Sequence, residues 1–408
     1  MDTIIFLEAN QSGTSRDAIR AASELGLYTV LFTQKKQLLR KRDNFKEVHR
    51  MIYINDLHDE QAVQKKITEI KQLGAAILSI ISFIDGYVRL AAHYSLPYSH
   101  VPFSLPAIGL MEDKICTRKI LKDHPANLDF QVIDLQGKNI RVDLPFPFIL
   151  KSPNSSGSKD VFLINSHDQL QQSILAFKKK TDLLLIEEYA DGDQYLIEVL
   201  IKDSVPYIMA VIKQTITHEE RFIVTGYSIS PVYREEFFHK LQKTIISIAA
   251  EFQLANGSAH FEMRYSSNGW KLIEINPRPA GGAINRMVEK STGIQLAKET
   301  INLNLGRPLS LRNKRQINIH TAYLTVPKDG VLKKVTGSLK AALSKGVIDV
   351  FIKPSEGSKL FKPVSMGHRY GYVMAAGRTV AAAERFAVQA AKEICFHVEE
   401  YKGQSAAN

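Results

Sequence analysis

The 408-residue chain is poor in cysteine, with two residues, and has a single tryptophan. Cys116 and Cys395 lie far apart and belong to no ligand-spaced cluster, which argues against a disulfide framework or a zinc site. The longest apolar run, residues 75–84, is interrupted by serines and is too short to span a membrane. The N-terminal segment carries Asp2 and Glu8 and does not resemble a secretory signal. We therefore expect a cytoplasmic protein with no membrane partner.

Acidic residues are fewer than basic ones, and the formal net charge is +11. The basic residues are spread along the chain, and the one dense run, residues 35–42, contains no aromatic side chain. Nucleic-acid-binding proteins combine clustered cations with aromatic side chains that stack on bases. We therefore expect no nucleic-acid partner, and we expect part of the excess charge to serve a small anionic ligand.

The first hundred residues alternate strand-like and helix-like segments, which predicts a parallel sheet with crossover helices. The expected elements are strands at residues 3–8, 28–33, 51–54 and 75–82, and a helix from about residue 14 to residue 25. The first turn, residues 10–13, holds one glycine, whereas the dinucleotide-binding fingerprint needs three. We predict a Rossmann-like domain without that fingerprint.

The pattern changes after about residue 110. A helix with Lys114 leads to an extended segment that ends at Lys151, and strands dominate residues 183–276 around one helix at 235–252. An alanine-rich helix is expected from residue 380 to about residue 395. The chain therefore combines α/β and α+β parts, and we predict domains at residues 1–105, 106–185, 186–310 and 311–408.

The strongest local feature is a pair of strand-like segments, residues 260–264 and 272–276. Side-chain alternation places three residues of each on one face, namely His260, Glu262 and Arg264, and Leu272, Glu274 and Asn276. A three-residue loop at 267–269 would pair residue 266 with residue 270 and set Glu262 opposite Glu274. Facing carboxylates repel unless a cation lies between them, and Asn276 would complete an all-oxygen set suited to Mg²⁺.

The alternative for this hairpin is a two-residue turn at Asn268 and Gly269. That turn would pair residue 262 with residue 275 and place the two glutamates on opposite faces. The result would be an ordinary solvated hairpin, and both interpretations stay open at this point.

Lys151 precedes a loop of small residues that includes Ser155, Ser156, Gly157 and Ser158. The backbone N–H groups of such a loop can approach phosphate oxygens, and the lysine adds positive charge, although similar loops are also simple connections. Lys114 and Arg118 are four residues apart, so they share one face of their helix.

Two further segments carry polar groups. The apolar segment 183–186 runs into Glu187, Glu188 and Tyr189, which can offer backbone groups to an adenine edge or be ordinary surface residues. Arg278 is followed by Gly281 and Gly282, a combination that suits a phosphate or carboxylate. The alternative for Arg278 is a salt bridge to Glu274 or its neighbour.

Taken in order, these segments resemble the ATP-grasp superfamily over about residues 1–310. The resemblance implies an ATP-grasp fold with a Rossmann-like N-terminal domain, a small subdomain with a phosphate loop, a large subdomain with a metal site, and a C-terminal mixed α/β domain. It also implies ATP as cofactor, with two Mg²⁺ ions that Mn²⁺ can replace.

The roles that the resemblance implies follow the matching positions. Lys114 and Lys151 correspond to the lysines that bind the nucleotide, and residues 155–158 correspond to the phosphate loop. The adenine hinge corresponds to Glu187, Glu188 and Tyr189, and the metal ligands correspond to Glu262, Glu274 and Asn276. The groups that stabilise the reaction intermediate correspond to Arg278, Gly281 and Gly282. One position departs, because Gln194 stands where the family usually has a ribose-binding glutamate. A glutamine can still hydrogen-bond a hydroxyl.

The run from His368 to Val373, with the alanine-rich helix after it, resembles bacterial L-amino acid ligases, most closely the arginine-accepting members. This implies an ADP-forming carbon–nitrogen ligase that joins two amino acids into a dipeptide through an aminoacyl phosphate. The segment 213–230, which holds Lys213, His218, Glu219 and Glu220, is expected to be a substrate-facing strand and loop. A basic first amino acid would pair with Glu219, Glu220 or Asp85, and the alternative is that these glutamates are solvated loop residues. A homodimer is compatible with this resemblance.

Two other functions stay open. One is another ATP-grasp carboxylate–amine ligase or carboxylase, of the purine-pathway or biotin-carboxylase type. The other is a nucleotide-binding regulatory protein, which the paired lysines and oxygen ligands argue against because regulation alone does not require two metal ions.

Overall fold

The N-terminal part of the chain forms a parallel sheet with strand order β3-β2-β1-β4. The computed structural model describes residues 1–137, 140–153, 160–178, 180–218 and 222–400. The elements of this part are β1 (Asp2–Leu7), α1 (Thr14–Glu24), β2 (Tyr28–Thr33), α2 (Lys36–Arg40), β3 (Arg50–Tyr53), α3 (Glu60–Gln72), β4 (Ala76–Ile81) and α4 (Val88–Ser95). The predicted parallel sheet with crossover helices is confirmed.

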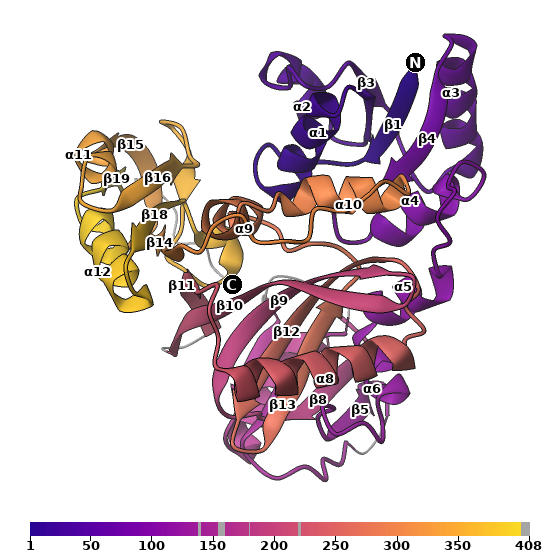
Figure 1. Cartoon of the computed structure of the whole chain (residues 1–408). Coiled ribbons are helices and arrows are strands. Elements are labelled where there is room, and N and C mark those ends of the chain that lie inside the picture. The colour runs from indigo at the N-terminus through magenta and orange to yellow at the C-terminus, as the bar shows by residue number, and fades with distance from the viewer. Residues whose placement is uncertain (138–139, 154–159, 179, 219–221, 401–408) are drawn as a thin grey trace.

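Helices cover both faces of this sheet. One face packs on α3 and α4, and the other packs on α1 and on α10 (Leu296–Asn304), which supplies Ala297 and Ile301 to the same core. Figure 1 shows α10 beside the N-terminal strands although it lies far along the chain. The N-terminal sheet therefore depends on a distant segment for part of its core.

A second, antiparallel sheet has the order β5-β8-β6-β7. Its strands are β5 (Phe130–Asp134), β6 (Phe148–Lys151), β7 (Val161–Ile164) and β8 (Leu183–Glu188), and α7 (His167–Phe177) covers one face. The helices α5 (Leu105–Glu112) and α6 (Lys114–Ile120) precede this sheet in the chain. The sheet places Lys151 and Glu187 on adjacent strands.

The largest sheet is antiparallel, with eight strands in the order β13-β12-β9-β10-β11-β14-β18-β16. These are β9 (Asp193–Lys202), β10 (Val205–His218), β11 (Phe222–Ile229), β12 (Gly257–Ser266), β13 (Gly269–Asn276), β14 (Asn318–Leu324), β16 (Val347–Ile352) and β18 (Gly371–Gly377). On one face α5 and α8 (Glu235–Glu251) bury an apolar core, and α9 (Ile284–Thr292) packs on the other. Since β11 pairs with β14, the sheet continues across residue 310, where we predicted a domain boundary.

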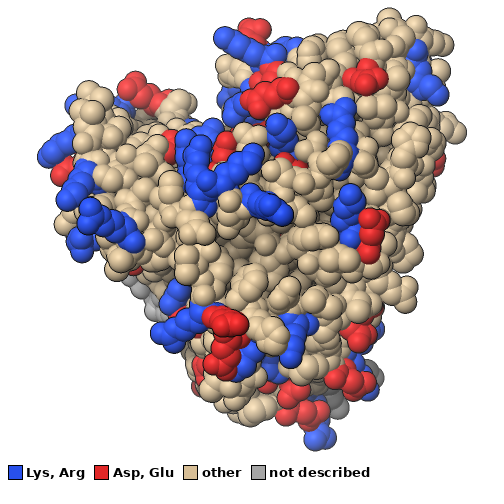
Figure 2. Space-filling model, viewed as in Figure 1, with Lys and Arg blue, Asp and Glu red and all other residues tan. Residues whose placement is uncertain are grey.

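The C-terminal part adds a small sheet with the order β17-β15-β19. Its elements are β15 (Gly330–Thr336), α11 (Ser338–Ala342), β17 (Lys359–Leu360), α12 (Val380–Ala391) and β19 (Cys395–Glu399). The predicted alanine-rich helix is present, but it ends at Ala391, and Cys395 begins a strand. In Figure 2 this part and the N-terminal part form two lobes with a hollow between them, and several Lys and Arg side chains gather where the lobes meet. Among the described residues, no helix has the length and apolar character to cross a bilayer.

His320 on β14 is a buried histidine in the middle of the large sheet. Its Nδ1 lies 2.8 Å from Ser228 Oγ, and a Cβ on Gly226 would come within 2.8 Å of its Nε2. Burial lowers the pKa of His320 below the ordinary value of 6.5, against a smaller opposing effect of Glu384. Because the folded state resists protonation, the stability that His320 contributes is present above pH 6.5 and is lost as the pH falls below it.

We expect His320→Gln to have a lower free energy of unfolding than the wild type at about pH 7.5, and we expect this difference to become smaller toward about pH 5.5. The difference should shrink by about 1.4 kcal/mol for each unit by which the pKa of His320 is lowered. Urea unfolding of both proteins at several pH values measures it, with the exposed His239→Gln as the control. A gap that stays constant with pH would contradict the prediction.

Candidate active site

Glu262 and Glu274 are directly paired across β12 and β13, as predicted. Neither predicted loop is correct, however, because the turn has residues 267–268 at its centre and Ser266 pairs with Gly269. That turn alone would set residue 262 opposite residue 273. Gly269 has a φ of 92°, a conformation that glycine adopts without strain.

A β-bulge in β13 restores the predicted pairing. The register shifts between the Met263–Leu272 pair and the Glu262–Glu274 pair, which leaves Ile273 as the extra residue. Leu272 therefore lies in the apolar core, and the prediction that it shares a face with Glu274 is wrong. Ile273 and Glu274 both face the pocket described below. On β12 the predicted alternation holds, because Glu262 faces the pocket and Met263 the core.

Each of the two facing carboxylates has a cationic neighbour. Glu274 Oε1 lies 3.5 Å from Lys114 Nζ and accepts a hydrogen bond of 3.3 Å from Asn276 Nδ2. Glu262 Oε1 lies 3.6 Å from His260 Nε2. Burial by itself raises the pKa of Glu262, but the hydrogen bond and charge of His260, with the lysines of the site, outweigh burial and lower the pKa. Glu262 is therefore ionised at neutral pH.

His260 lies between Glu198 and Glu262 in a buried relay of charged side chains, which the sequence analysis did not predict. Its Nδ1 lies 2.7 Å from Glu198 Oε1, and Glu198 Oε2 accepts a 3.1 Å hydrogen bond from the backbone N–H of Ala280. Burial lowers the pKa of His260, but Glu198 and Glu262 outweigh this effect and raise the pKa to about 9. The position of His260 on the same strand face as Glu262 was the available signal. Its partner on β9 could not be identified from spacing.

Lys151 and Arg118 share one buried carboxylate. Glu187 accepts from Arg118 Nε at 2.6 Å and from Lys151 Nζ at 2.7 Å, and all three side chains are at most 4% exposed. Burial raises the pKa of Glu187, but the two cations outweigh burial and lower it. The Glu187 side chain is therefore occupied, which leaves only its backbone groups for the predicted adenine hinge.

Arg118 also holds the bulge of β13. Its Nη2 donates to the carbonyl of Ile273 at 2.8 Å, and its Nη1 donates to Asn127 Oδ1 at 3.1 Å. Beside it, the N–H of Leu272 donates to the carbonyl of Ala126 at 2.7 Å. Arg118 thus connects the sheet that carries Lys151 and Glu187 with the β-bulge that sets the position of Glu274.

Lys114, Lys151, Glu187, Glu262 and Glu274 line one pocket, whose empty space, including the part open to solvent, is about 860 Å³. Its polar lining consists of Lys114, Lys151, Glu187, Glu188, Tyr189, Gln194, Gln214, Glu262, Arg264 and Glu274. Gln194 Oε1 accepts from Arg264 Nε at 3.2 Å, and its Nε2 donates to Glu262 at 3.4 Å. Gln214 Oε1 is buried and has no hydrogen-bond partner among the described residues. Gln214, which we did not predict, is therefore a free acceptor in the pocket.

Arg278 and Asp85, which we predicted for separate roles, pair with each other. Arg278 Nε and Nη2 each donate to Asp85 at 2.5 Å, and this joins the turn after β13 to the N-terminal part. The predicted alternative of a bridge to Glu274 or its neighbour is wrong. Gly281 and Gly282 are exposed, and Gly282 has a φ of 67°.

The other predicted substrate residues lie away from these contacts or outside the described part. Lys213 Nζ pairs with Asp193 at 2.6 Å in a half-exposed bridge. His218 ends β10, but its side chain is not among those described. The loop residues Ser155, Ser156, Gly157, Ser158, Glu219 and Glu220 lie outside the described residues.

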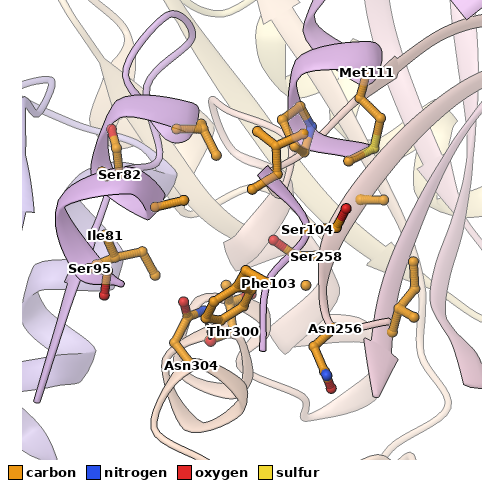
Figure 3. A pocket seen from close by; sticks show the side chains of 18 of the residues that line it. Ile81, Ser82, Ser95, Phe103, Ser104, Met111, Asn256, Ser258, Thr300 and Asn304 are labelled. Atoms are coloured by element: carbon orange, nitrogen blue, oxygen red, sulfur yellow. Dashed lines mark hydrogen bonds between the residues drawn. The ribbon is translucent and has the colours of Figure 1, made fainter. Parts of the chain in front are cut away.

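A second cavity lies between the end of β4, α5, the start of β12 and α10 (Figure 3). Phe103 and Met111 contribute apolar surface to it, and none of the predicted site residues lines it. Ser82 Oγ, at its edge, already donates to the carbonyl of Leu7 at 2.7 Å. The chemistry of the chain is therefore expected at the carboxylate-lined pocket.

Comparisons with known proteins agree with this arrangement. A family model described as an ATP-grasp domain matches residues 144–286, which include Lys151, Glu187 and the β12–β13 hairpin. A second model, L-amino acid ligase C-terminal domain 2, matches residues 322–399. The chain therefore contains an ATP-grasp domain, and its last part is an L-amino acid ligase C-terminal domain. ATP-grasp ligases use ATP and divalent metal ions.

The chain is similar to an L-arginine-specific L-amino acid ligase of Bacillus subtilis, with 26% identity over 229 residues, which are 52% of this chain and 54% of that protein. It thus spans about half the length of the curated relatives that it matches.

Among solved structures, an L-amino acid ligase from Bacillus licheniformis superposes with a TM-score of 0.84 over 98% of this chain and 99% of the other, at 16% identity. N5-carboxyaminoimidazole ribonucleotide synthetase from Thermotoga maritima superposes with a TM-score of 0.70 over 98% and 100%, at 15% identity. At these identities the superpositions show the fold alone.

Proposed function

We propose that this protein is an ATP-dependent L-amino acid ligase that joins two amino acids into a dipeptide and releases ADP and phosphate. The observation that carries this proposal is the C-terminal match to L-amino acid ligases, joined to a pocket with paired carboxylates and two lysines. The first amino acid would be activated as an aminoacyl phosphate, and the amine of the second would then displace the phosphate.

The pocket suits a divalent cation. Glu262, Glu274 and Asn276 offer carboxylate and amide oxygens, the ligands that Mg²⁺ prefers. No group of three or more His, Cys, Asp or Glu side chains that could hold a metal ion occurs in the described part of the chain. A bound metal ion would therefore need additional oxygens, which ATP phosphates and water would supply. We propose two Mg²⁺ ions here, with Mn²⁺ as a substitute, to neutralise the phosphate charge when bound.

The residues of the chain would act by positioning and by charge. Lys114 and Lys151 would bind phosphate oxygens, and the relay from Glu198 through His260 would keep Glu262 ionised and oriented. The backbone after Glu187 would face the adenine, and the free oxygen of Gln214 would accept a hydrogen bond from the nucleotide. The predicted phosphate loop at 155–158 would cover the nucleotide.

The Arg278–Asp85 pair supports an amino acid as the first substrate. A free amino acid carries one carboxylate and one ammonium group, so it can replace both partners of this pair at once. We propose that Arg278 binds the substrate carboxylate and, with the N–H groups of Gly281 and Gly282, the oxyanion that forms from it. The half-exposed carboxylate of Asp85 would then face the ammonium group of the substrate. Arginine and lysine are the first donors to test, because a relative of the chain is an L-arginine-specific ligase.

A phosphate-release screen over pairs of L-amino acids, with ATP and Mg²⁺, tests the proposal. We expect release that requires two amino acids, with a dipeptide as the product in mass spectrometry. Reactions with bicarbonate and no amino acid form a parallel arm. Release in that arm alone would favour a carboxylase-type enzyme, and no turnover in either arm would favour a regulatory nucleotide-binding protein.

A further inference from the structure

Arg369 comes from the C-terminal part of the chain, one residue after the 3₁₀ turn η2 (Met366–His368). It is half-buried, and its guanidinium lies 3.9 Å from the ring centroid of Tyr323 and 5.7 Å from that of Tyr227. The two tyrosine rings pack edge to face, with their centroids 5.5 Å apart. The guanidinium plane is therefore held on an aromatic support.

This guanidinium lacks the partner that comparable arginines of the chain have. Arg369 Nε donates to the carbonyl of Met366 at 3.3 Å and Nη1 to the hydroxyl of Tyr227 at 3.4 Å, both long contacts. No carboxylate lies within ion-pair distance of Arg369 among the described residues, whereas Arg118 and Arg278 each hold one. A half-buried charge without a counter-ion is unfavourable, so this position suits an anionic ligand.

Arg369 lies beside the carboxylate-lined pocket and beside the turn that holds Gly281 and Gly282. Met366, which accepts its Nε hydrogen bond, lines the carboxylate pocket, and Glu262 is close enough for its charge to act on the guanidinium. Tyr323, on which Arg369 stacks, is near the turn, because a Cβ on Gly282 would lie 3.6 Å from its hydroxyl. An anion at Arg369 would therefore be close to the reacting groups.

Three anionic groups take part in the proposed reaction, and two already have cations assigned. Lys114 and Lys151 serve the phosphates, and Arg278 serves the carboxylate of the first amino acid. The carboxylate of the second amino acid, which remains in the product, has none. Arg369 belongs to the segment 322–399, the part that matches L-amino acid ligases and lies outside the ATP-grasp match. A residue specific to the acceptor is expected in that part.

We propose that Arg369 binds the carboxylate of the acceptor amino acid and so orients its amine toward the acyl phosphate. The proposal rests on the proposed function. The planar fork of arginine can hold a carboxylate through two parallel hydrogen bonds, and stacking on Tyr323 fixes that plane. This subsite would make the enzyme prefer acceptors with a free carboxylate over amines that lack one.

The test compares an acceptor amino acid with its own amide, which has the same amine and no carboxylate. In the wild type, kcat/KM should be much higher for the amino acid. In Arg369→Met, KM for the amino acid should rise about 30-fold or more, while kcat/KM for the amide changes less than about threefold. Arg369→Lys keeps the charge but not the fork, and should recover only part of the preference.

Arg385→Met is the matched control, because Arg385 also lies over an aromatic ring, that of Phe386 at 5.5 Å, but is exposed on α12. It should keep the wild-type preference, and thermal unfolding of each variant shows whether the fold is retained. Equal losses with the amino acid and the amide, or unchanged preference in Arg369→Met, would overturn the acceptor role while the ligase function stands. Absence of ligation by the wild type would overturn the proposed function, and the role of Arg369 with it.

Discussion

Replacement of Glu274 by alanine is expected to lower ATP turnover by about 100- to 1,000-fold or more. Glu274 is one of two carboxylates that face each other across β12 and β13, and Glu262 alone cannot hold a metal ion in the same place. Without the metal, the phosphate charge that develops during transfer would lose its main counter-charge. The loss should appear in kcat and should not be restored by saturating ATP.

The fold should survive this change. The Glu274 side chain is 26% exposed, and Lys114, its partner at 3.5 Å, is 13% exposed but lines the pocket, where water can solvate its charge. Removal of one of two facing carboxylates also relieves their repulsion in the metal-free protein. We therefore expect the free energy of unfolding to stay within about 1 kcal/mol of the wild type.

Phosphate release and urea unfolding of the same preparation test both parts. Glu399→Ala is the matched control, because Glu399 is a strand glutamate that pairs with Lys333 at 2.5 Å, on the small C-terminal sheet. It should retain turnover. Wild-type turnover in Glu274→Ala would refute the metal assignment.

Arg118→Met is expected to have the second large effect, a loss of about 3–5 kcal/mol in the free energy of unfolding. The change removes one of two cations from the buried carboxylate of Glu187. It also leaves Asn127 Oδ1 and the carbonyl of Ile273 without their donor. Because Ile273 is the bulge residue, Glu274 should lose its defined position, and the Mg²⁺ concentration for half-maximal activity should rise about tenfold or more.

Arg118→Lys keeps the positive charge beside Glu187, but a lysine cannot reach the same three acceptors in fixed geometry. It should remain folded and still need more Mg²⁺ than the wild type. Arg16→Met is the control, since Arg16 forms a similarly buried ion pair with Glu47 in the N-terminal part. That variant should be less stable with an unchanged Mg²⁺ requirement. An unchanged requirement in both Arg118 variants would contradict the positioning role.

Local periodicity was sufficient to predict much of the framework. The strand β2 and the start of α8 lie at the predicted residues, because apolar patterns with periods of two and 3.6 residues depend only on near neighbours. The facing carboxylates were also predicted, although through a loop that does not exist. The bulge at Ile273 could not be predicted, because its acceptor contact with Arg118 joins residues 155 positions apart.

The sequence by itself therefore determined which chemical groups the protein has and in which order: two lysines, a small-residue loop, two strand glutamates and an arginine before a glycine pair. The tertiary structure decided which of these groups meet. It directed Glu187 to Arg118 and Lys151, paired Arg278 with Asp85, and left Arg369 without an ion-paired carboxylate in the part of the chain that the structure describes. These outcomes depend on the distances between segments that are remote in the chain. An ion pair is strong only when its charges lie a few ångströms apart, and the spacing of residues in the sequence does not reveal that distance.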